Sequence, residues 1–496
     1  MRPFARPFAA LAILSAALAG PSLALAAVDA AGAAALEALL EERLGRLARA
    51  KEGVRLDRAP DATVTPRGDA YAIRLPEVRV VTPSGALVEA AEIVGTAVPV
   101  DGGGWEIKAT IPAPLAVFGP EGFRLGEVTI GRQAFTGRWA DNLRTLVGLD
   151  TAYRDVLFTP REGKGIVRLG TLAATMKPDS YAGGRWTGPA TLTVADLLAR
   201  DADGTERLAL GRLSAKVRIE GLDVARYAAW NAAAAARAAV DDGRDGLNAA
   251  ERTATLAALP HLDRLLSAWT GTLDVKELRR VRPDGTKEAL PSLTASLDAI
   301  GLDTDRARLK LDYAHKGLTA AGPSVKREVV PADGGLTLSG TALPLASLRD
   351  AHARRLKEQP AIGDKAATRN LNERVTRAMA EAGAELRLDR LDFQAPDAGA
   401  LGNGLFTFDD ATARGLMGGL TLTLRGFEAL VAQAGGGGRN PGPALALYAL
   451  QGLGAADTDR QGRPVRTYRI EVAADGRVLL NGTDVSGLLD GLLSFR

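Results

Sequence analysis

Histidine is the side chain best suited to acid–base chemistry near neutral pH and to metal binding, and the 496-residue chain has three, at His261, His315 and His352. A zinc site needs several His, Cys or carboxylate ligands at short spacing, as in an HExxH motif. The three histidines lie far apart in the sequence, no HExxH motif occurs, and cysteine is absent. We therefore expect no transition-metal site and ordinary structural roles for the histidines.

One oxygen-rich stretch is a calcium candidate. Its possible ligands are Asp241, Asp245, Asn248 and Glu251. They surround Gly246 between two helical runs, and Ca²⁺ takes several oxygens from a tight loop in which glycine allows the sharp turn. The stretch departs from a calcium loop because its third position is Gly243 and the closing acid comes one residue early. The alternative is a polar turn whose residues cap the second helix.

Other catalytic patterns are missing from the sequence. There is no Gly-x-Ser-x-Gly elbow, Walker loop or dinucleotide fingerprint. Residues 162–165, Glu-Gly-Lys-Gly, lack the flanking residues of a phosphate loop, and we interpret them as a hairpin turn. The carboxylates Asp241–Asp242 and Asp409–Asp410 are adjacent in sequence, whereas glycosidases need two acids facing across a cleft. We assign no catalytic residue and no cofactor.

A repeated unit dominates the elements around these residues. Residues 191–223 and 272–303 both begin Thr-Leu-x-Val, reach Asp-Gly-Thr after the same interval and end in Gly-Leu-Asp. Alternating apolar residues on either side of Asp-Gly predict a strand, a tight turn and a second strand with one apolar face. A hairpin cannot bury such a face alone and needs neighbours. The alternative is chance similarity between hairpins of biased composition.

The first residues predict export. Arg2 and Arg6 precede an apolar run over 7–18, and Ala24-Leu25-Ala26 follows, which is typical of a secretory signal peptide over 1–26. A membrane anchor is the alternative, but the run is shorter than the ~20 residues that a span needs. Removing 1–26 lowers the formal charge from +3 to +1, so we expect no nucleic-acid partner. We expect a periplasmic protein with no transmembrane span in the mature chain.

The pattern as a whole predicts an α+β fold of mostly antiparallel, curved sheets built from hairpin units, with helical inserts. A short helix is also expected over 139–149. The predicted segments are a signal peptide (1–26), an amphipathic helix (27–53), a β-rich region with the first repeat copy (54–223), a helical insert (224–270), a β-rich region with the second copy (271–345), a charged helical segment interrupted at Pro360 (346–385), and a C-terminal β-rich region with a terminal hairpin and short helix (386–496).

The two repeats and the closing stretch over 476–482, Gly-Arg-Val-Leu-Leu-Asn-Gly, resemble two groups of bacterial envelope proteins over about half the chain. These are the AsmA-like proteins, linked to phospholipid traffic and built as a long curved sheet with an apolar groove, and the YdgA-type family. The chain departs from them in lacking a retained N-terminal membrane helix. The resemblance implies lipid or envelope-protein partners and brings no catalytic residues.

Four functions remain open from the sequence. The first is an exported, non-enzymatic protein that binds lipid or another apolar ligand along a curved sheet, and the second is an assembly factor that works through protein contacts, with the charged helices as its surface. The third is an outer-membrane barrel, which a 5% aromatic content and helical inserts disfavour. The fourth is a hydrolase with an unrecognised site.

Overall fold

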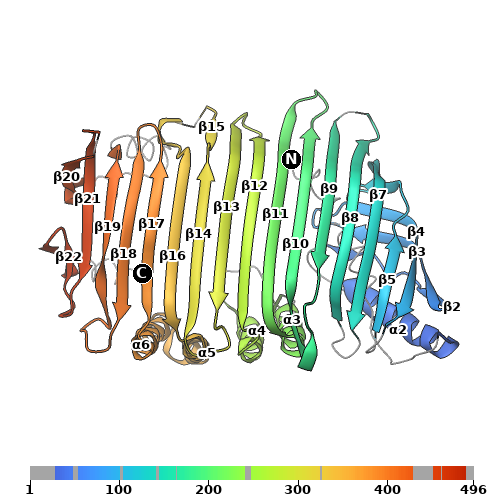
Figure 1. Cartoon of the computed structure of the whole chain (residues 1–496), viewed down its shortest axis with the longest axis horizontal. Helices are drawn as coiled ribbons and strands as arrows, with labels where there is room; N and C mark the ends of the chain where they lie inside the picture. The colour runs from blue at the N-terminus through green and yellow to red at the C-terminus, as the bar shows by residue number, and fades with distance from the viewer. Residues whose placement is uncertain are drawn as a thin grey trace. The chain divides into compact units, whose positions relative to one another are not determined.

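A computed structural model describes residues 28–48, 54–100, 104–140, 145–163, 165–238, 240, 247–323, 325, 327–427, 451–459 and 461–487. Its contacts divide the chain into two compact units. Unit 1 comprises residues 1–225 and 275–283, and unit 2 comprises residues 226–274 and 284–496. The prediction of a mostly antiparallel β fold with several helices is confirmed (Figure 1).

Unit 1 is an antiparallel sheet in which β1 and β2 both pair with β3, successive strands pair from there on, and β5 and β6 share the place between β4 and β7. Its strands are β1 (Arg55–Leu56), β2 (Thr63–Arg67), β3 (Ala70–Val81), β4 (Leu87–Pro99), β5 (Gly104–Thr110), β6 (Leu115–Phe118), β7 (Arg124–Ala140), β8 (Thr145–Pro160), β9 (Ile166–Met176), β10 (Arg185–Arg200) and β11 (Glu206–Asp223).

The core of unit 1 lies beneath the N-terminal helix α2 (Ala30–Ala48). Leu36, Leu40 and Leu44 recur on one helical face, as the sequence predicts, and all are 0% exposed. They belong to the same buried cluster as Ile73 of β3 and Ile107 of β5. The helix therefore packs on its own unit, and it covers the apolar side of the strands below it.

A line of unusual positions crosses five neighbouring strands of unit 1 and reaches residue 277. Its members are Gly131, Asp155, Gly170, Asp196, Gly211 and Glu277. The three acids adopt left-handed backbone angles, with φ between 54° and 56°. Each lies against a glycine of an adjoining segment: a Cβ added to Gly170 would lie 2.8 Å from the Cβ of Asp196. The strand ladders skip these residues, so glycine and acid replace the usual side-chain pair.

Unit 2 continues with antiparallel strands and carries the other helices. Its elements are α3 (Val224–Ala238, largely in this unit), α4 (Ala249–Ala258), η2 (Leu259–Leu262), β12 (Ala268–Val281, divided between the units), β13 (Lys287–Ile300), β14 (Ala307–Lys316), β15 (Thr319–Ala321), η3 (Arg327–Val329), β16 (Asp333–Leu343), α5 (Leu345–Ile362), α6 (Asp364–Ala382), β17 (Glu385–Gln394), β18 (Gly399–Phe408), β19 (Leu416–Arg425), β20 (Ala455–Thr458), β21 (Pro464–Val472), β22 (Val478–Leu480) and β23 (Thr483–Asp484).

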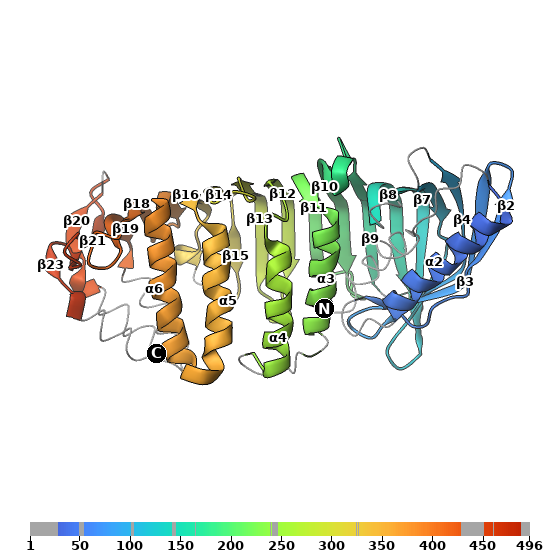
Figure 2. The same ribbon diagram turned by 90° about the horizontal axis from the view of Figure 1, so that it is seen from below.

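Helices α5 and α6 form an antiparallel pair between β16 and β17. In Figure 2 they stand side by side and extend away from the strand ends of unit 2. Met379 of α6 is buried with Ala307, Leu343 and Ala384, which lie at these strand ends. Gly383 ends α6 in a left-handed conformation, and the next amide, of Ala384, donates to the Met379 carbonyl. The pair is therefore anchored at its base.

Two local predictions were wrong. The described residues of 139–149 are in strands and not in a helix: β7 runs to Ala140, β8 starts at Thr145, and Trp139 pairs with Leu146. Cross-strand pairing of the apolar residues outweighs the weak helical pattern there. The charged helices are not interrupted at Pro360, because α5 continues to Ile362 and the break falls at Gly363, which has φ 79°. Pro360 removes one backbone hydrogen bond of the helix, and the helix ends two residues later.

Other predictions fall on turns and termini. Both Asp-Gly turns occur, with Gly204 and Gly285 at φ 82° and 83°. Of the predicted turn over 162–165, the described residues 162, 163 and 165 lie between β8 and β9. The predicted signal peptide and the terminal short helix lie outside the described residues. Among the helices that the structure describes, none combines the length and the apolar character needed to cross a membrane.

Candidate ligand-binding face

One face of the unit 2 sheet is apolar across seven strands. Residues paired across a ladder point to the same side of a sheet. Leu297 of β13 pairs with Leu311 of β14, and Leu311 pairs with Leu338 of β16. The row continues through β17, β18, β19 and β21, and a parallel row lies two residues away. We name this surface the open apolar face; its central members are Leu297, Leu311, Leu336, Leu338, Leu388, Leu391, Leu420, Leu422 and Ile470.

The central members of the open apolar face are only partly covered. None of the nine is fully buried, and Leu338 is 40% exposed. In unit 1, by contrast, the apolar strand residues Ile73 and Ile107 beneath α2 are at most 1% exposed. A sheet face normally packs against a second layer, so a row of half-exposed leucines is unusual.

Packed clusters lie at both ends of the open apolar face. At one end, Leu309 and Phe408 pack against the cluster formed with α5 and α6. At the other, Phe427 and Tyr468 are buried, with Leu422 and Leu424 against them. The middle of the face, around Leu338, belongs to neither cluster. The arrangement leaves an apolar strip bordered by packed side chains.

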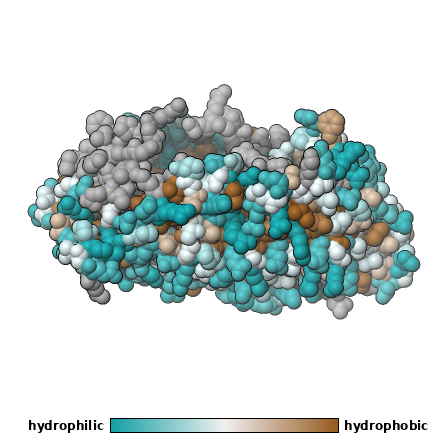
Figure 3. Space-filling model, turned by 90° about the horizontal axis from the view of Figure 1, so that it is seen from above, coloured by the Kyte–Doolittle hydropathy of each residue, from teal (hydrophilic) through white to brown (hydrophobic). Residues whose placement is uncertain are grey.

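The opposite face of the same strands is largely polar, although it also carries Leu401, Leu405 and Met417, which are 36–49% exposed. Lys310 contacts Asp312 at 2.9 Å, and the hydroxyl of Thr337 donates to Asp312 at 2.7 Å. These hydrogen bonds, first of all the one from Lys310, hold the pKa of Asp312 below its usual value. A hollow of about 890 Å³ lies on this side, with Asn403 and Thr421 among its lining residues. Figure 3 views the molecule from above, along the strands rather than onto this face, and shows mostly hydrophilic residues with apolar residues between them.

His315 lies at the end of one row of the open apolar face and has a structural role. It is 4% exposed and lies over Gly334, with the rings of Tyr313 and Phe393 at 5.6 and 6.0 Å. Its Nε2 donates to the carbonyl of Pro331 at 3.0 Å, because a carbonyl can only accept. In the neutral ring, Nδ1 then accepts from the Tyr313 hydroxyl at 3.0 Å. Both ring nitrogens are satisfied, and the ring fills the space above a glycine.

Of the other predicted site residues that the structure describes, Asn248 and Glu251 are in contact, whereas the histidines lie in separate elements. His261 lies in η2 and His352 on α5, where burial lowers the pKa of the imidazole. Asn248 and Glu251 form a reciprocal capping box at the start of α4, with Glu251 3% exposed, whereas Asp241 and Asp245 lie outside the described residues. In the part of the chain that the structure describes, no three His, Cys, Asp or Glu side chains could share a metal ion.

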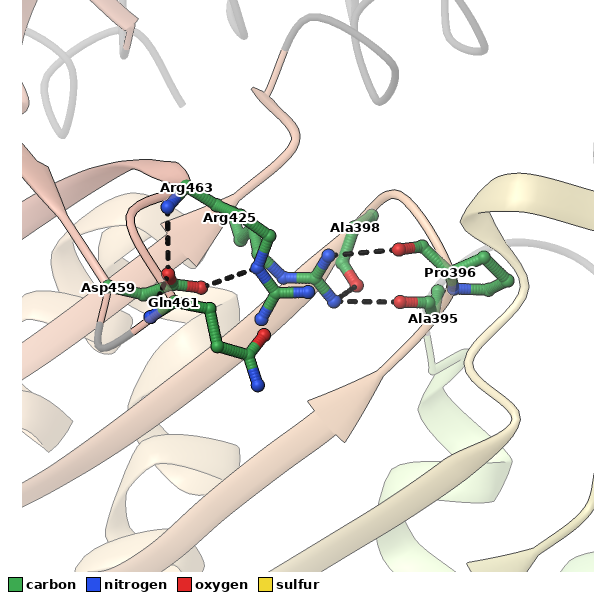
Figure 4. Close-up of polar contacts among 7 residues, drawn as sticks. All are labelled: Ala395, Pro396, Ala398, Arg425, Asp459, Gln461 and Arg463. Carbon is green, nitrogen blue, oxygen red and sulfur yellow. Dashed lines mark hydrogen bonds and ion pairs between the residues drawn. The ribbon is translucent and has the colours of Figure 1, made fainter.

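Asp409 and Arg425 also have structural partners. The Asp409 carboxylate accepts from the amide of Ala411 at 2.9 Å, as in a turn. The guanidinium of Arg425 donates to the carbonyls of Ala395, Pro396 and Ala398 at 2.7–2.9 Å. Figure 4 shows this side chain beside the ion pair of Arg463 with Asp459. Arg425 therefore stabilises the β17–β18 turn, because its guanidinium hydrogen bonds go to backbone carbonyls of that turn.

Sequence reasoning detected the alternating strands but missed the open apolar face itself. Its members come from strands between residues 287 and 472, and no local pattern specifies which of them become neighbours. The signal that was available is the repetition of Leu at every second position in many strands.

No model of a protein family, no curated protein and no solved structure matches this chain.

Proposed function

We propose that the protein is a non-enzymatic carrier or receptor for an apolar ligand, most simply a lipid acyl chain, which lies on the open apolar face of unit 2. The observation that carries the proposal is the row of half-exposed leucines around Leu338. Seven strands at about 4.8 Å spacing give a strip roughly 29 Å across. An acyl chain that fills half of the ~30 Å hydrocarbon core of a bilayer needs about 15 Å.

The expected gain is large enough to support binding. Removing apolar surface from water contributes about 25 cal/mol per Å², or about 0.8 kcal/mol per buried CH₂ group. Part of this is offset by the cost of ordering the ligand. A single chain on an open face is therefore expected to bind reversibly, and a ligand with two chains more tightly.

The finer architecture belongs to the same proposal. We take the hairpins at 191–223 and 272–303 as copies of one unit, and the glycine–acid line of unit 1 as a crease that curves the sheet. Left-handed residues interrupt the ladder and redirect a strand, and such devices introduce curvature into sheets. A periplasmic location, inferred from the signal-like residues 1–26, would place the protein between two membranes that supply lipid.

Two matched variants test the proposal. Leu338→Asp places a charge on the open apolar face, and Leu405→Asp places the same charge on the opposite face, where Leu405 is 36% exposed. Binding of a fluorescent long-chain fatty acid is expected to fall at least tenfold in the first variant, since losing one leucine contact costs about 1.5–3 kcal/mol. The second variant is expected to bind as the wild type does. Equal binding by both variants, with circular dichroism unchanged, would contradict the proposal.

A second candidate is an assembly factor that acts through α5 and α6. Arg354, Lys357, Lys365 and Arg369 are exposed on this pair, and Ile362 at its tip is 45% exposed. Cross-linking at Ile362 that captures a single envelope protein, and that Arg354→Glu with Arg369→Glu abolishes, would favour this function over lipid binding.

A further inference from the structure

A hollow of about 590 Å³ lies on the sheet of unit 1, over strands β2, β3, β4, β5 and β7. Successive residues of a strand point to opposite faces of the sheet. Ile73 and Ile107 are buried beneath α2, whereas the next residues, Arg74 and Lys108, are exposed and line the hollow. The hollow is therefore on the side of the sheet away from α2 and is separate from the core of the unit.

Cations and small side chains line this hollow. Its charged lining residues are Arg67, Arg74 and Lys108, and no Asp or Glu is among the described residues that line it. The side chains between the cations are small, namely Ala70, Ala72, Val94, Thr96, Thr110, Ala134 and Thr136. The aromatic lining residues Tyr71 and Phe135 are 1% and 6% exposed, so they offer no ring on which a nucleobase could stack. The lining suits a ligand that is recognised by charge and hydrogen bonds.

The three cations of the lining are only weakly neutralised. Within the described part of the chain, Arg67 forms no hydrogen bond or ion pair. Lys108 contacts Glu106 at 3.0 Å and has 61% of its side chain exposed. Arg74 contacts Glu92 at 3.8 Å and has 67% of its side chain exposed. Exposed ion pairs of this kind contribute little free energy, so an incoming anion can replace the two carboxylates.

Two arginines adjoin the hollow and face each other across β7 and β8. Arg132 pairs with Arg154 and lies two residues from Ala134 of the lining, so both side chains are on the exposed side of the sheet. Among the described residues neither has a hydrogen bond or an ion pair, and the adjoining acid Asp155 lies against Gly131. Like charges directly opposite each other destabilise an antiparallel pair of strands. An anion bound between the two guanidinium groups removes this repulsion.

We name this surface the basic hollow; its cations are Arg67, Arg74, Lys108, Arg132 and Arg154. We propose that it is a second binding site, for an oligoanion that carries several phosphate or carboxylate groups. The proposal goes beyond the apolar ligand of unit 2 and does not depend on it.

The spread of the cations favours an oligoanion over a single small ion. Strands β4 and β5 lie between β3, which carries Arg74, and β7, which carries Arg132. At the usual spacing of neighbouring strands this separation is about 14 Å. A ligand with several anionic groups therefore reaches more of the cations than inorganic phosphate does. Arginine suits such groups because its planar guanidinium binds a carboxylate or phosphate through two parallel hydrogen bonds, and the threonine hydroxyls supply further donors.

Isothermal titration calorimetry on the full chain tests the site with tripolyphosphate, hexagalacturonate, inorganic phosphate and the uncharged maltohexaose. We expect at least one of the two oligoanions to bind about tenfold more tightly than inorganic phosphate, as one additional charge-assisted hydrogen bond allows. The oligoanion that binds more tightly shows whether phosphate or carboxylate is the recognised group. Arg74→Gln and Arg154→Gln are each expected to weaken that binding about tenfold.

Lys216→Gln is the matched control, because it removes the same charge from the same face outside the basic hollow. Lys216 is exposed on β11 and is joined to Thr136 of the lining by successive cross-strand pairs through β8, β9 and β10. This variant is expected to bind as the wild type does. Thermal unfolding separates binding from folding: without ligand, Arg154→Gln should not lower the unfolding temperature, because it removes a like-charge contact. With the oligoanion that binds, the wild type should gain more stability than Arg154→Gln.

Several results would overturn the site. Binding by Arg154→Gln that is as tight as binding by the wild type, or an equal loss on Lys216→Gln, would show that the attraction does not depend on the basic hollow. Inorganic phosphate bound as tightly as the oligoanions, or maltohexaose bound as tightly as hexagalacturonate, would contradict recognition of several anionic groups. Failure of both oligoanions to bind would also overturn the proposal, and it would leave the function proposed for unit 2 unaffected.

Discussion

At the scale of single residues, the glycine–acid line shows how tightly neighbouring strands constrain one another. A Cβ on Gly170 would lie 2.9 Å from the Oδ2 of Asp196 as well as 2.8 Å from its Cβ. Gly170→Ala is therefore expected to lower the free energy of unfolding by about 1–3 kcal/mol through overpacking. Thermal unfolding measures this, and the double variant Gly170→Ala with Asp196→Gly should recover most of the loss. Equal stability of Gly170→Ala and the wild type would show that the strands separate at no cost.

At Arg264, a substitution is expected to raise the stability of the protein, whereas the change at Gly170 lowers it. Its left-handed backbone costs an L-residue roughly 1–2 kcal/mol, and glycine avoids most of that cost. Arg264→Gly should therefore raise the unfolding temperature, while Arg264→Ala, which keeps a Cβ, should not. A fall in stability on Arg264→Gly would mean that the side chain makes contacts that outweigh the backbone cost.

At the scale of elements, the contact of Asp263 with Arg349 ties the base of α5 to the turn after η2. The pKa of Asp263 is lowered in the fold by its hydrogen bond with Arg349, so its stabilising contribution is present above the ordinary value of 3.8. That contribution is lost as the pH falls through the lowered pKa. Asp263→Asn removes the charge at neutral pH and should speed hydrogen exchange over residues 345–356. Asp303→Asn is the control and should leave that exchange unchanged.

At the scale of the whole molecule, the helices of unit 2 lie at the ends of the strands. The strands pair directly with one another, and this pairing does not depend on the helices. Thr341 of β16 pairs directly with Glu385 of β17, so a two-residue turn could replace α5 and α6. We expect this deletion to keep the strand signal in circular dichroism, to lower the unfolding temperature because Leu309 and Phe408 lose their cover, and to weaken fatty-acid binding. Loss of the strand signal would show that the helix pair is required for folding of the sheet.

What the sequence determined by itself is local. The Asp-Gly turns at 203–204 and 284–285, the alternation within strands, the leucine face of α2 and the two helices after Leu343 follow from φ preferences, periodicity and capping among near neighbours. The prediction of a helix over 139–149 was wrong because pairing with a neighbouring strand outweighed the helical pattern of these residues. No local pattern in the sequence reports such pairing.

What only the tertiary structure decided is which distant residues become neighbours. The register of the ladders aligns Leu297 with Leu311 and Leu338 and leaves that row half-exposed, whereas in unit 1 the apolar side of the strands is covered by α2. The same long-range pairing assembles the glycine–acid line and brings Arg264 to Asp303. Register is set by the sum of many cross-strand contacts, so it is a property of the assembled sheet and not of any single stretch of sequence.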